Sequence, residues 1–251
     1  MNEISIAVLA DNSAEPPFRA EHGFSALIEI PGFAPVLFDT GMGALFDNSK
    51  SALVDLSRVS DVVLSHGHYD HTDALSAFAK EHPSVLIHAS SEALRPHYSL
   101  RTGSCRSIGV SQENRDLLSQ TAKDRFIPFT GEDSISGGAI RLAAPIPRLH
   151  PDETPSPLLF EDAACSVPDS VPDELVLWMN TAKGLVLVTG CCHAGFINTC
   201  NFVRSLSGGL PIRAVIGGFH LAHVPQERLE ATAAYIREQR IELVVACRGT
   251  G

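Results

Sequence analysis

Short apolar segments recur along the chain and predict β-strands. In the N-terminal half they cover residues 24–30, 35–39, 61–65 and 84–88, and the first ten residues predict another strand. Amphipathic segments of helical length, such as residues 48–59 and 72–81, lie between several of these strands. Such an alternation of strands and helices is typical of an α/β protein.

A second group of predicted strands lies in the C-terminal third. Residues 175–179 and 185–189 flank a five-residue segment that ends in Gly184 and predicts a hairpin. Residues 214–218 and 241–246 predict two further strands, separated by a helix that Pro225 can begin. The chain shows no internal repeat at a fixed period, which argues against a repeat architecture.

Residues 145–172 interrupt the strand pattern. This segment contains seven prolines and several acidic residues, with no clear periodicity. Because proline fixes φ and lacks a backbone donor, we predict an ordered loop or lid there. Strands of similar character resume on both sides, which favours an insertion beside a site over a linker between domains. We therefore predict a single domain over residues 1–251 with this loop or lid.

The charge balance narrows the set of partners. Among 251 residues, 19 are Lys or Arg and 29 are Asp or Glu, which gives a net charge of −10. We expect neither nucleic acid nor an anionic membrane surface as a partner. The N-terminus lacks the pattern of a secretory signal, and no apolar run reaches the ~20 residues of a membrane-spanning helix. These features predict a cytoplasmic protein whose six cysteines are reduced thiols.

The strongest chemical signal is a histidine cluster directly after the predicted strand at residues 61–65. The sequence His66-x-His68-x-Asp70-His71 places three imidazoles and a carboxylate within six residues. These groups are ligands of Zn²⁺ and related divalent cations, and a turn at a strand end lets several of them face one pocket. A chance occurrence in a chain of this composition is roughly a 10⁻³ event. The motif therefore predicts a metal site, against the alternative of incidental histidines in a polar turn.

Two later histidines follow predicted strands in the same way. His193 comes after residues 185–189 through Gly190, and His220 comes after residues 214–218. Ligands in open α/β architectures collect at the edge where such strands end. We predict that both are metal ligands, with a buried structural histidine as the alternative for each.

The motif, preceded by the sequence Phe38-Asp39-Thr40-Gly41, resembles the metallo-β-lactamase superfamily. The similarity runs from about residue 20 to the end, through residues 21–25, 189–195, 216–221 and 250–251. It is to one branch, which contains metal-dependent hydrolases and 7,8-dihydropterin-6-ylmethyl-4-(β-D-ribofuranosyl)aminobenzene-5′-phosphate synthases. The resemblance implies an α/β (α+β) fold, namely a four-layer αββα sandwich of two mixed β-sheets with metals at one edge.

The resemblance also implies which residues bind metal. One site would use His66, His68 and His193, and a second would use Asp70, His71 and His220. The cofactor would be one or two divalent ions per chain, with zinc favoured and manganese or iron as alternatives.

Three neighbouring residues have a role in this scheme. Asp70 would be the catalytic residue that orients a water or takes its proton. Cys191 could ligate or bridge metals, or could be a small core residue. Asp39 could accept a hydrogen bond that fixes the tautomer of a ligand histidine, or could simply form a turn.

The chain departs from the branch at its end. Members of the branch usually carry His-Cys-Thr-Gly after the last strand, whereas this chain has Arg248 and Gly249 at the first two positions. Arginine stays protonated and cannot bind a metal, so the second site could be weak or lost. Arg248 could instead clamp a substrate anion, or reflect neutral drift.

The other candidates are less specific. Arg148 and His88 are candidate substrate contacts, as is His150 in the proline-rich segment. We expect surface or packing roles for the remaining histidines, namely His22, His82, His97 and His223.

Together these features predict a metal-dependent hydrolase acting on a small anionic ester, phosphoester or lactone. A transferase of the pterin-synthase type is one alternative. A non-catalytic metal- or ligand-binding protein with an impaired second site is another.

Overall fold

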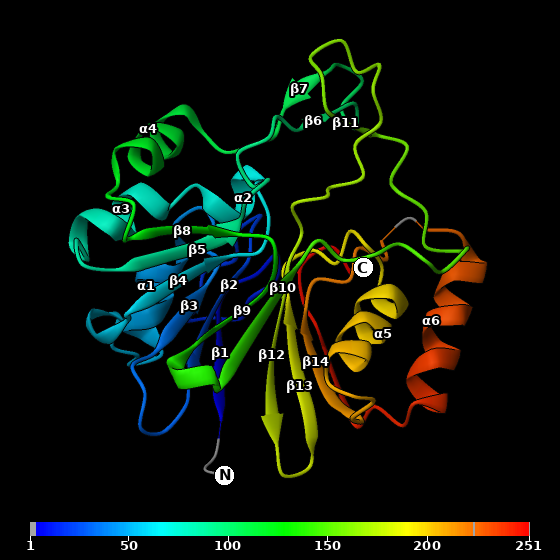
Figure 1. The fold of residues 1–251 in the computed structure, drawn as a ribbon. Coiled ribbons are helices and arrows are strands. Elements are labelled where there is room, and N and C mark those ends of the chain that lie inside the picture. The colour runs from blue at the N-terminus through cyan, green and yellow to red at the C-terminus, as the bar shows by residue number, and fades with distance from the viewer. Residues whose placement is uncertain (1–3, 223, 251) are drawn as a thin grey trace.

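Two six-stranded β-sheets face each other in the structure, a computed structural model that describes residues 4–222 and 224–250 (Figure 1). His223, for which we expected a surface or packing role, lies outside the described residues. The first sheet contains, in spatial order, β1 (Ser5–Ala10), β2 (Ser25–Glu29), β3 (Val36–Phe38), β4 (Asp61–Leu64), β5 (Leu86–Ser90) and β8 (Phe126–Phe129). The second contains β15 (Leu243–Ala246), β14 (Ile212–Gly217), β13 (Gly184–Thr189), β12 (Val176–Thr181), β10 (Ile140–Ala144) and β9 (Gly131–Ile135).

Both sheets are mixed. In the first, β3, β4, β5 and β8 run parallel, while β1 and β2 pair antiparallel. In the second, β13, β14 and β15 run parallel, and β9, β10, β12 and β13 pair antiparallel. The parallel strands of both sheets are short and almost wholly apolar, as expected for strands that are covered on both faces.

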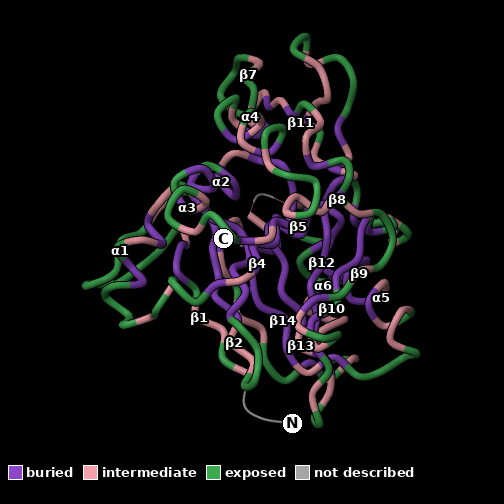
Figure 2. The backbone as a smooth tube through the Cα atoms, turned by 60° about the vertical axis from the view of Figure 1, so that its left-hand side comes forward, coloured by how far each residue is buried: buried purple, intermediate pink, exposed green. Residues whose placement is uncertain are grey.

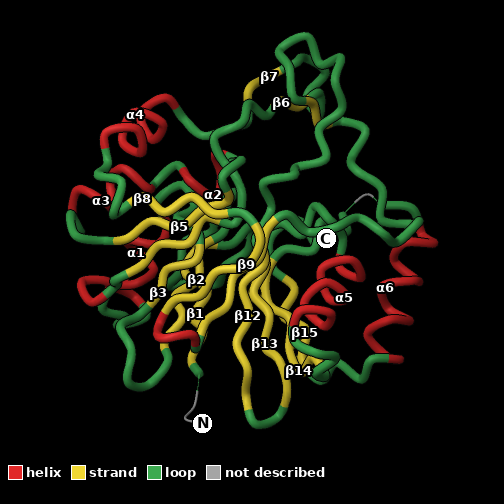
Figure 3. Tube along the Cα trace, viewed as in Figure 1, coloured by secondary structure: helices red, strands yellow, loops and turns green. Residues whose placement is uncertain are grey.

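Three apolar layers hold the sheets and helices together. Side chains such as Phe38 and Val63 meet Leu142, Leu177 and Met179 between the two sheets. The outer face of the first sheet is covered by α1 (Ala44–Ser51), α3 (Leu75–Glu81) and α4 (Gln112–Gln120), and that of the second by α5 (Phe196–Leu206) and α6 (Gln226–Glu238). Figure 3 shows these helices on the two outer sides. The predicted four-layer αββα sandwich is confirmed.

Burial follows this layering. Figure 2 shows buried backbone along the central strands and exposed backbone in the outer turns. Among the described residues, no helix combines the length and apolar character needed to cross a membrane.

The boundaries of several elements differ from those predicted. The helix expected over residues 48–59 instead begins at Ala44 and ends at Ser51, followed by a short 3₁₀ helix, η1 (Leu56–Arg58). A residue outside α1 fixes the start of this helix, because the Glu21 carboxylate accepts hydrogen bonds from the backbone N–H groups of Met42 and Ala44. The hairpin between β12 and β13 is also tighter than predicted, since Thr181 already pairs with Gly184.

A small third sheet lies beyond the ends of the two main sheets, at the top of Figure 1. It contains β7 (Arg106–Ser107), β6 (Tyr98–Ser99) and β11 (Leu159–Phe160), and we call residues 98–107 and 154–171 together the cap. The remaining short elements are α2 (Tyr69–Thr72) and a second 3₁₀ helix, η2 (Ser136–Gly138). Within residues 145–172, the proline-rich segment, the structure has only β11 as a named strand.

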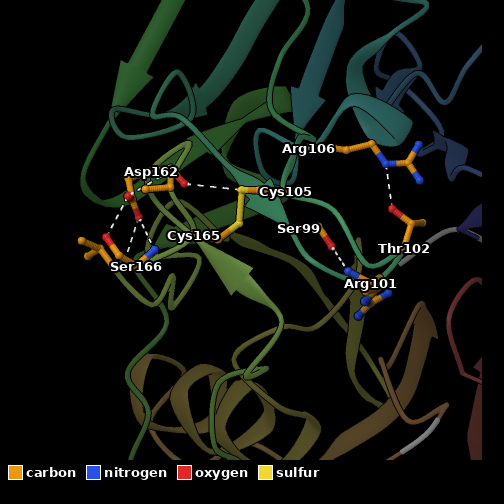
Figure 4. The surroundings of a disulfide bond; sticks show 10 residues. Ser99, Arg101, Thr102, Cys105, Arg106, Asp162, Cys165 and Ser166 are labelled. Carbon is orange, nitrogen blue, oxygen red and sulfur yellow. Dashed lines mark hydrogen bonds between the residues drawn. A yellow bond between two sulfur atoms is a disulfide. The ribbon is translucent and has the colours of Figure 1, made fainter.

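A disulfide between Cys105 and Cys165 ties the two parts of the cap together (Figure 4). It links positions 60 residues apart in the sequence, and Cys105 Sγ also contacts the carbonyl of Asp162. The expectation that all six cysteines are reduced thiols is therefore wrong for this pair. The prediction of a cytoplasmic location loses the support that it took from reduced cysteines.

Candidate metal centre

The functional side chains gather where parallel strands of both sheets end. The segments that follow these strands carry Asp39 after β3, residues 65–71 after β4, Cys191 and His193 after β13, His220 after β14 and Arg248 after β15. Because the carboxyl ends of parallel strands share one edge, residues far apart in the sequence meet there. Asp39, Cys192 and His220 have positive φ values of 58°, 57° and 49°, a strained conformation that is concentrated at functional sites.

Three histidines form a compact cluster at this edge. One ring nitrogen from each of His66, His68 and His193 lies within 4.8 Å of the others, and all three residues are buried. Their Nε2 atoms have no hydrogen-bond partner among the described residues. Burial, reinforced by repulsion between neighbouring imidazoles, holds the pKa of each well below its usual value, so the rings are neutral. Three converging neutral imidazoles with free lone pairs fit a divalent metal such as zinc.

A hydrogen-bonded chain sets the tautomer of His66. The Ser65 hydroxyl donates to Asp39 Oδ2 at 2.6 Å, and its oxygen lies 2.8 Å from His66 Nδ1. With its proton given to the carboxylate, the hydroxyl oxygen accepts from Nδ1–H, which leaves the lone pair of His66 on Nε2. Gly190 permits this contact, because a Cβ there would lie 2.1 Å from Ser65 Oγ.

Replacing Ser65 with alanine should weaken metal binding, because His66 loses the acceptor that fixes its tautomer. We expect an affinity loss of about 10- to 100-fold, the usual effect of removing such a supporting group. Competition with a chromogenic chelator measures it. Ser49→Ala in α1, where the hydroxyl bonds only a helix carbonyl, is the control. Unchanged affinity in Ser65→Ala would contradict this role.

Two of the three residues that the resemblance assigns to a second metal, Asp70 and His71, lie together with Cys191 around Arg248. The Arg248 guanidinium donates to Cys191 Sγ at 2.6 Å and forms an ion pair with Asp70 Oδ2. His71 lies beside them, with Nε2 3.2 Å from Cys191 Sγ and 3.4 Å from Arg248 Nη1. Its Nδ1 donates to Asp39 Oδ2 at 2.6 Å. The cluster is thus a network of alternating charges.

Electrostatics explain the protonation states in this network. Burial opposes ionisation of the Cys191 thiol, but Arg248 and His71 outweigh it and lower its pKa to about 5. Burial likewise opposes protonation of His71, yet Cys191 and Asp39 raise its pKa to about 10. Cys191 is therefore a thiolate at neutral pH, unlike Cys192, whose pKa burial raises well above its usual value.

Two adjoining cavities open onto the cluster. One, of about 380 Å³, is lined by Asp70, His68, Arg101, Arg106 and Arg248 among others. The second, of about 500 Å³, extends under the cap towards Arg148 and Arg228 and shares its boundary residues with the first, namely Arg101, Leu159, His193 and His220. Among the described residues that line them, the only acidic ones are Asp70 and Asp169, each paired with a basic group. The cavities are thus electropositive in an acidic protein.

The cap supplies part of the cavity wall. Arg101 and Arg106 come from the segment that the disulfide holds (Figure 4). Arg101 donates to His220 Nε2 at 2.6 Å, while the buried His220 Nδ1 has no partner among the described residues. His220 therefore faces the cavities with an arginine at its side.

Other predicted residues lie farther from the cluster. His88 is buried in β5, where it bonds Asp61 at 2.8 Å, and it does not line either cavity within the described residues. Its position in β5 turns His88 towards Asp61, and the substrate contact expected for it stays a prediction. Arg148 borders the second cavity and donates to the carbonyl of His193 at 2.6 Å, so it also positions a cluster residue.

Sequence reasoning assigned no site role to several residues that support the cluster. His97 is buried with its ring 4.9 Å from that of His68, and its Nδ1 lies 2.6 Å from Asp169. Asp173 accepts from the backbone N–H of Gly67 at 2.6 Å, inside the metal motif. Glu174 accepts from the N–H groups of His193 and Ala194. All three belong to segments whose sequence carries no local motif, so only their tertiary contacts identify them.

Comparisons with known proteins agree with this geometry. The model of the metallo-β-lactamase superfamily matches residues 19–165. An uncharacterized protein of Methanocaldococcus jannaschii is 34% identical over 238 residues, covering 93% of this chain and 86% of the relative. The 7,8-dihydropterin-6-methyl-4-(β-D-ribofuranosyl)-aminobenzene-5′-phosphate synthase of the same organism is 28% identical, covering 100% of this chain and 89% of that protein.

A solved structure shares both sequence and fold. The crystal structure of Tm1679, described as a metal-dependent hydrolase of the β-lactamase superfamily, is 30% identical with a TM-score of 0.82. The match covers 99% of this chain and 89% of that one. With the family model, the fold and the histidine cluster in agreement, this chain belongs to the metallo-β-lactamase superfamily.

Proposed function

We propose that the protein is a metal-dependent hydrolase of a small anionic ester, phosphoester or lactone. The observation that carries the proposal is the convergence, beside cavities lined by arginines, of three buried Nε2 atoms that have no hydrogen-bond partner in the described part of the chain. His66, His68 and His193 would hold the ion, with zinc favoured for an imidazole set and manganese or iron as alternatives. When bound, a divalent cation supplies Lewis acidity and lowers the pKa of water from about 15.7 towards about 7.

The side chains around the cluster then have separate tasks. Asp70 lines the first cavity beside His68 and would orient the attacking water and accept its proton. Its pairing with Arg248 keeps the carboxylate in one orientation. Arg101 and Arg106, at the wall of the same cavity, would hold the negative charge of the substrate.

Arg101→Ala should raise KM for anionic substrates about 10-fold, the expected effect of losing one charge-assisted hydrogen bond. Neutral esters of the same size should be affected little, because they offer no charge for the guanidinium. Steady-state kinetics on a matched pair of charged and neutral esters measures the difference. Arg141→Ala on β10, where the arginine pairs with Glu132, is the control. Equal effects on both substrates would argue against an anion-binding role.

A transferase of the pterin-synthase type is the second candidate. Two cavities that meet at His193 and His220 could hold two substrates side by side, and the relative that is 28% identical is such a synthase. Incubating the metal-loaded protein with a dihydropterin diphosphate and an aminobenzene ribose phosphate separates the two functions. A condensation product supports the transferase, whereas hydrolysis of single esters supports the hydrolase. Tight binding without turnover of either kind would indicate a non-catalytic protein.

A further inference from the structure

We propose that the Arg248 guanidinium occupies the place of a second metal ion, so that the protein holds one ion per chain at its three-histidine site. The inference rests on the proposed three-histidine site and adds the number of ions and the reason for it. It concerns the pocket formed by Asp70, His71 and Cys191, which the resemblance assigns in part to a second ion.

Arg248 makes the contacts that a metal cation bound in this pocket would make. Its Nη1 donates to Cys191 Sγ at 2.6 Å and its Nη2 both pairs with Asp70 and donates to His22 Nε2 at 2.9 Å. A guanidinium has several N–H donors and no lone pair, so it donates to the Cys191 sulfur and to the Asp70 carboxylate without any ion between them. The Cys191 sulfur and the Asp70 carboxylate, which could otherwise bind a second metal, are therefore already occupied by the guanidinium.

The main chain fixes the guanidinium in this position. Cys247 N donates to the carbonyl of Gly217 at 2.9 Å, which aligns the end of β15 with that of β14. Gly218 then lets the Arg248 backbone approach, because a Cβ there would lie 2.5 Å from the Arg248 carbonyl oxygen. The Arg248 side chain is only 9% exposed, so it has little freedom to leave the pocket.

Charge and ligand count both oppose a second divalent ion. An ion at this place would have to displace the buried Arg248 cation from the Asp70 carboxylate and the Cys191 sulfur, leaving that cation unpaired. The arginine also stands where the branch carries a histidine, so the pocket lacks a ligand. By contrast, His66, His68 and His193 make no contact with Arg248 short enough to be a hydrogen bond among the described residues, and their Nε2 atoms remain free.

The test is the metal stoichiometry of the wild-type protein and of Arg248→His. Apoprotein is incubated with excess Co²⁺ or Zn²⁺, passed through a desalting column and analysed by inductively coupled plasma mass spectrometry. We expect one ion per chain in the wild type and two in Arg248→His, where the new imidazole joins Asp70, His71 and Cys191. Arg58→His on the exposed 3₁₀ helix η1 is the matched control and should bind one ion.

Cobalt spectra give a second readout that is independent of activity. Cys191 should become a ligand only in Arg248→His, so a thiolate-to-cobalt charge-transfer band should appear in that variant and be absent from the wild type. Arg248→Lys keeps the positive charge and should remain at one ion without the band.

The outcomes separate the two proposals. Two ions per chain in the wild type, or a thiolate band in its cobalt spectrum, would overturn the role of Arg248. A folded Arg248→His protein that still binds one ion would overturn it too. None of these results would contradict the hydrolase proposal. A wild-type protein that takes up no ion would overturn the three-histidine site and both proposals with it.

Discussion

Replacing His68 with alanine should abolish metal binding and turnover while leaving the fold in place. His68 supplies one of three converging nitrogens, and the two that remain cannot complete a tetrahedral site with the same strength. We expect metal affinity to fall by more than about 100-fold, since removing a mere supporting group already costs 10- to 100-fold. Loss of the cation should lower kcat/KM by more than about 10³-fold, because its effect on the pKa of water is lost. Isothermal titration with Zn²⁺ and steady-state kinetics measure the two effects.

A matched control separates this loss from general damage. His82 lies at the end of α3, where its ring packs against Phe78, and it is absent from the walls of both cavities. His82→Ala should keep both metal affinity and turnover. Wild-type activity in a folded His68→Ala protein would remove the basis of the metal-dependent mechanism.

Asp70→Asn should lower both activity and stability. The amide cannot accept a proton from water, so we expect kcat to fall by about 10²- to 10⁴-fold, the usual contribution of a general base. The change also removes the carboxylate partner of the buried Arg248 and leaves it only Cys191, so the free energy of unfolding should fall, by less than the roughly 3–5 kcal/mol of a fully unpaired buried charge. Kinetics and urea denaturation of the same preparation measure the two effects.

The double variant Asp70→Asn with Arg248→Met distinguishes the causes. Removing the guanidinium that has lost its carboxylate partner should restore part of the stability, and Cys191 then keeps His71 as its remaining polar neighbour. It should not restore turnover, since the carboxylate is still missing. If Asp70→Asn alone retained full turnover, Asp70 would not be the catalytic carboxylate.

The strongly apolar strands and the histidine motif could be predicted from the sequence. β2, β3, β4 and β13 are short apolar runs with clear ends, so the hydrophobic effect alone identifies them. The motif at residues 66–71 is dense enough to indicate a metal site without any tertiary information. The order of strands at the edge then explains why His193 and His220 approach it.

The sequence of residues 96–144 has no clear apolar pattern from which its strands could be predicted. β9 has the sequence Gly-Glu-Asp-Ser-Ile and is mostly exposed at the edge of its sheet, so it lacks an alternating apolar pattern. β6 and β7 contain two residues each, and their pairings are with β11 and with each other. These strands therefore form because the cap folds, and the β-propensity of their own residues does not predict them. Arg101 and Arg106 of the cavity wall were missed because they lie in this cap.

Arg248 shows most clearly what the sequence alone cannot predict. The sequence shows that Arg248 departs from the pattern of the branch, but an anion clamp and neutral drift explain that departure equally well. Only the contacts with Asp70 and Cys191 favour a third explanation, in which the side chain takes the place of an ion. That explanation depends on how β14 and β15 align, which no local pattern encodes.

Anomalous X-ray diffraction from zinc-loaded crystals at the zinc edge tests the central claim most directly. We predict a single anomalous peak per chain, about 2.0–2.1 Å from the Nε2 atoms of His66, His68 and His193. The Arg248 guanidinium should remain between Asp70 and Cys191 in the same crystal. If crystals grown with excess zinc showed no anomalous peak at the three histidines, the proposed three-histidine metal site would be contradicted.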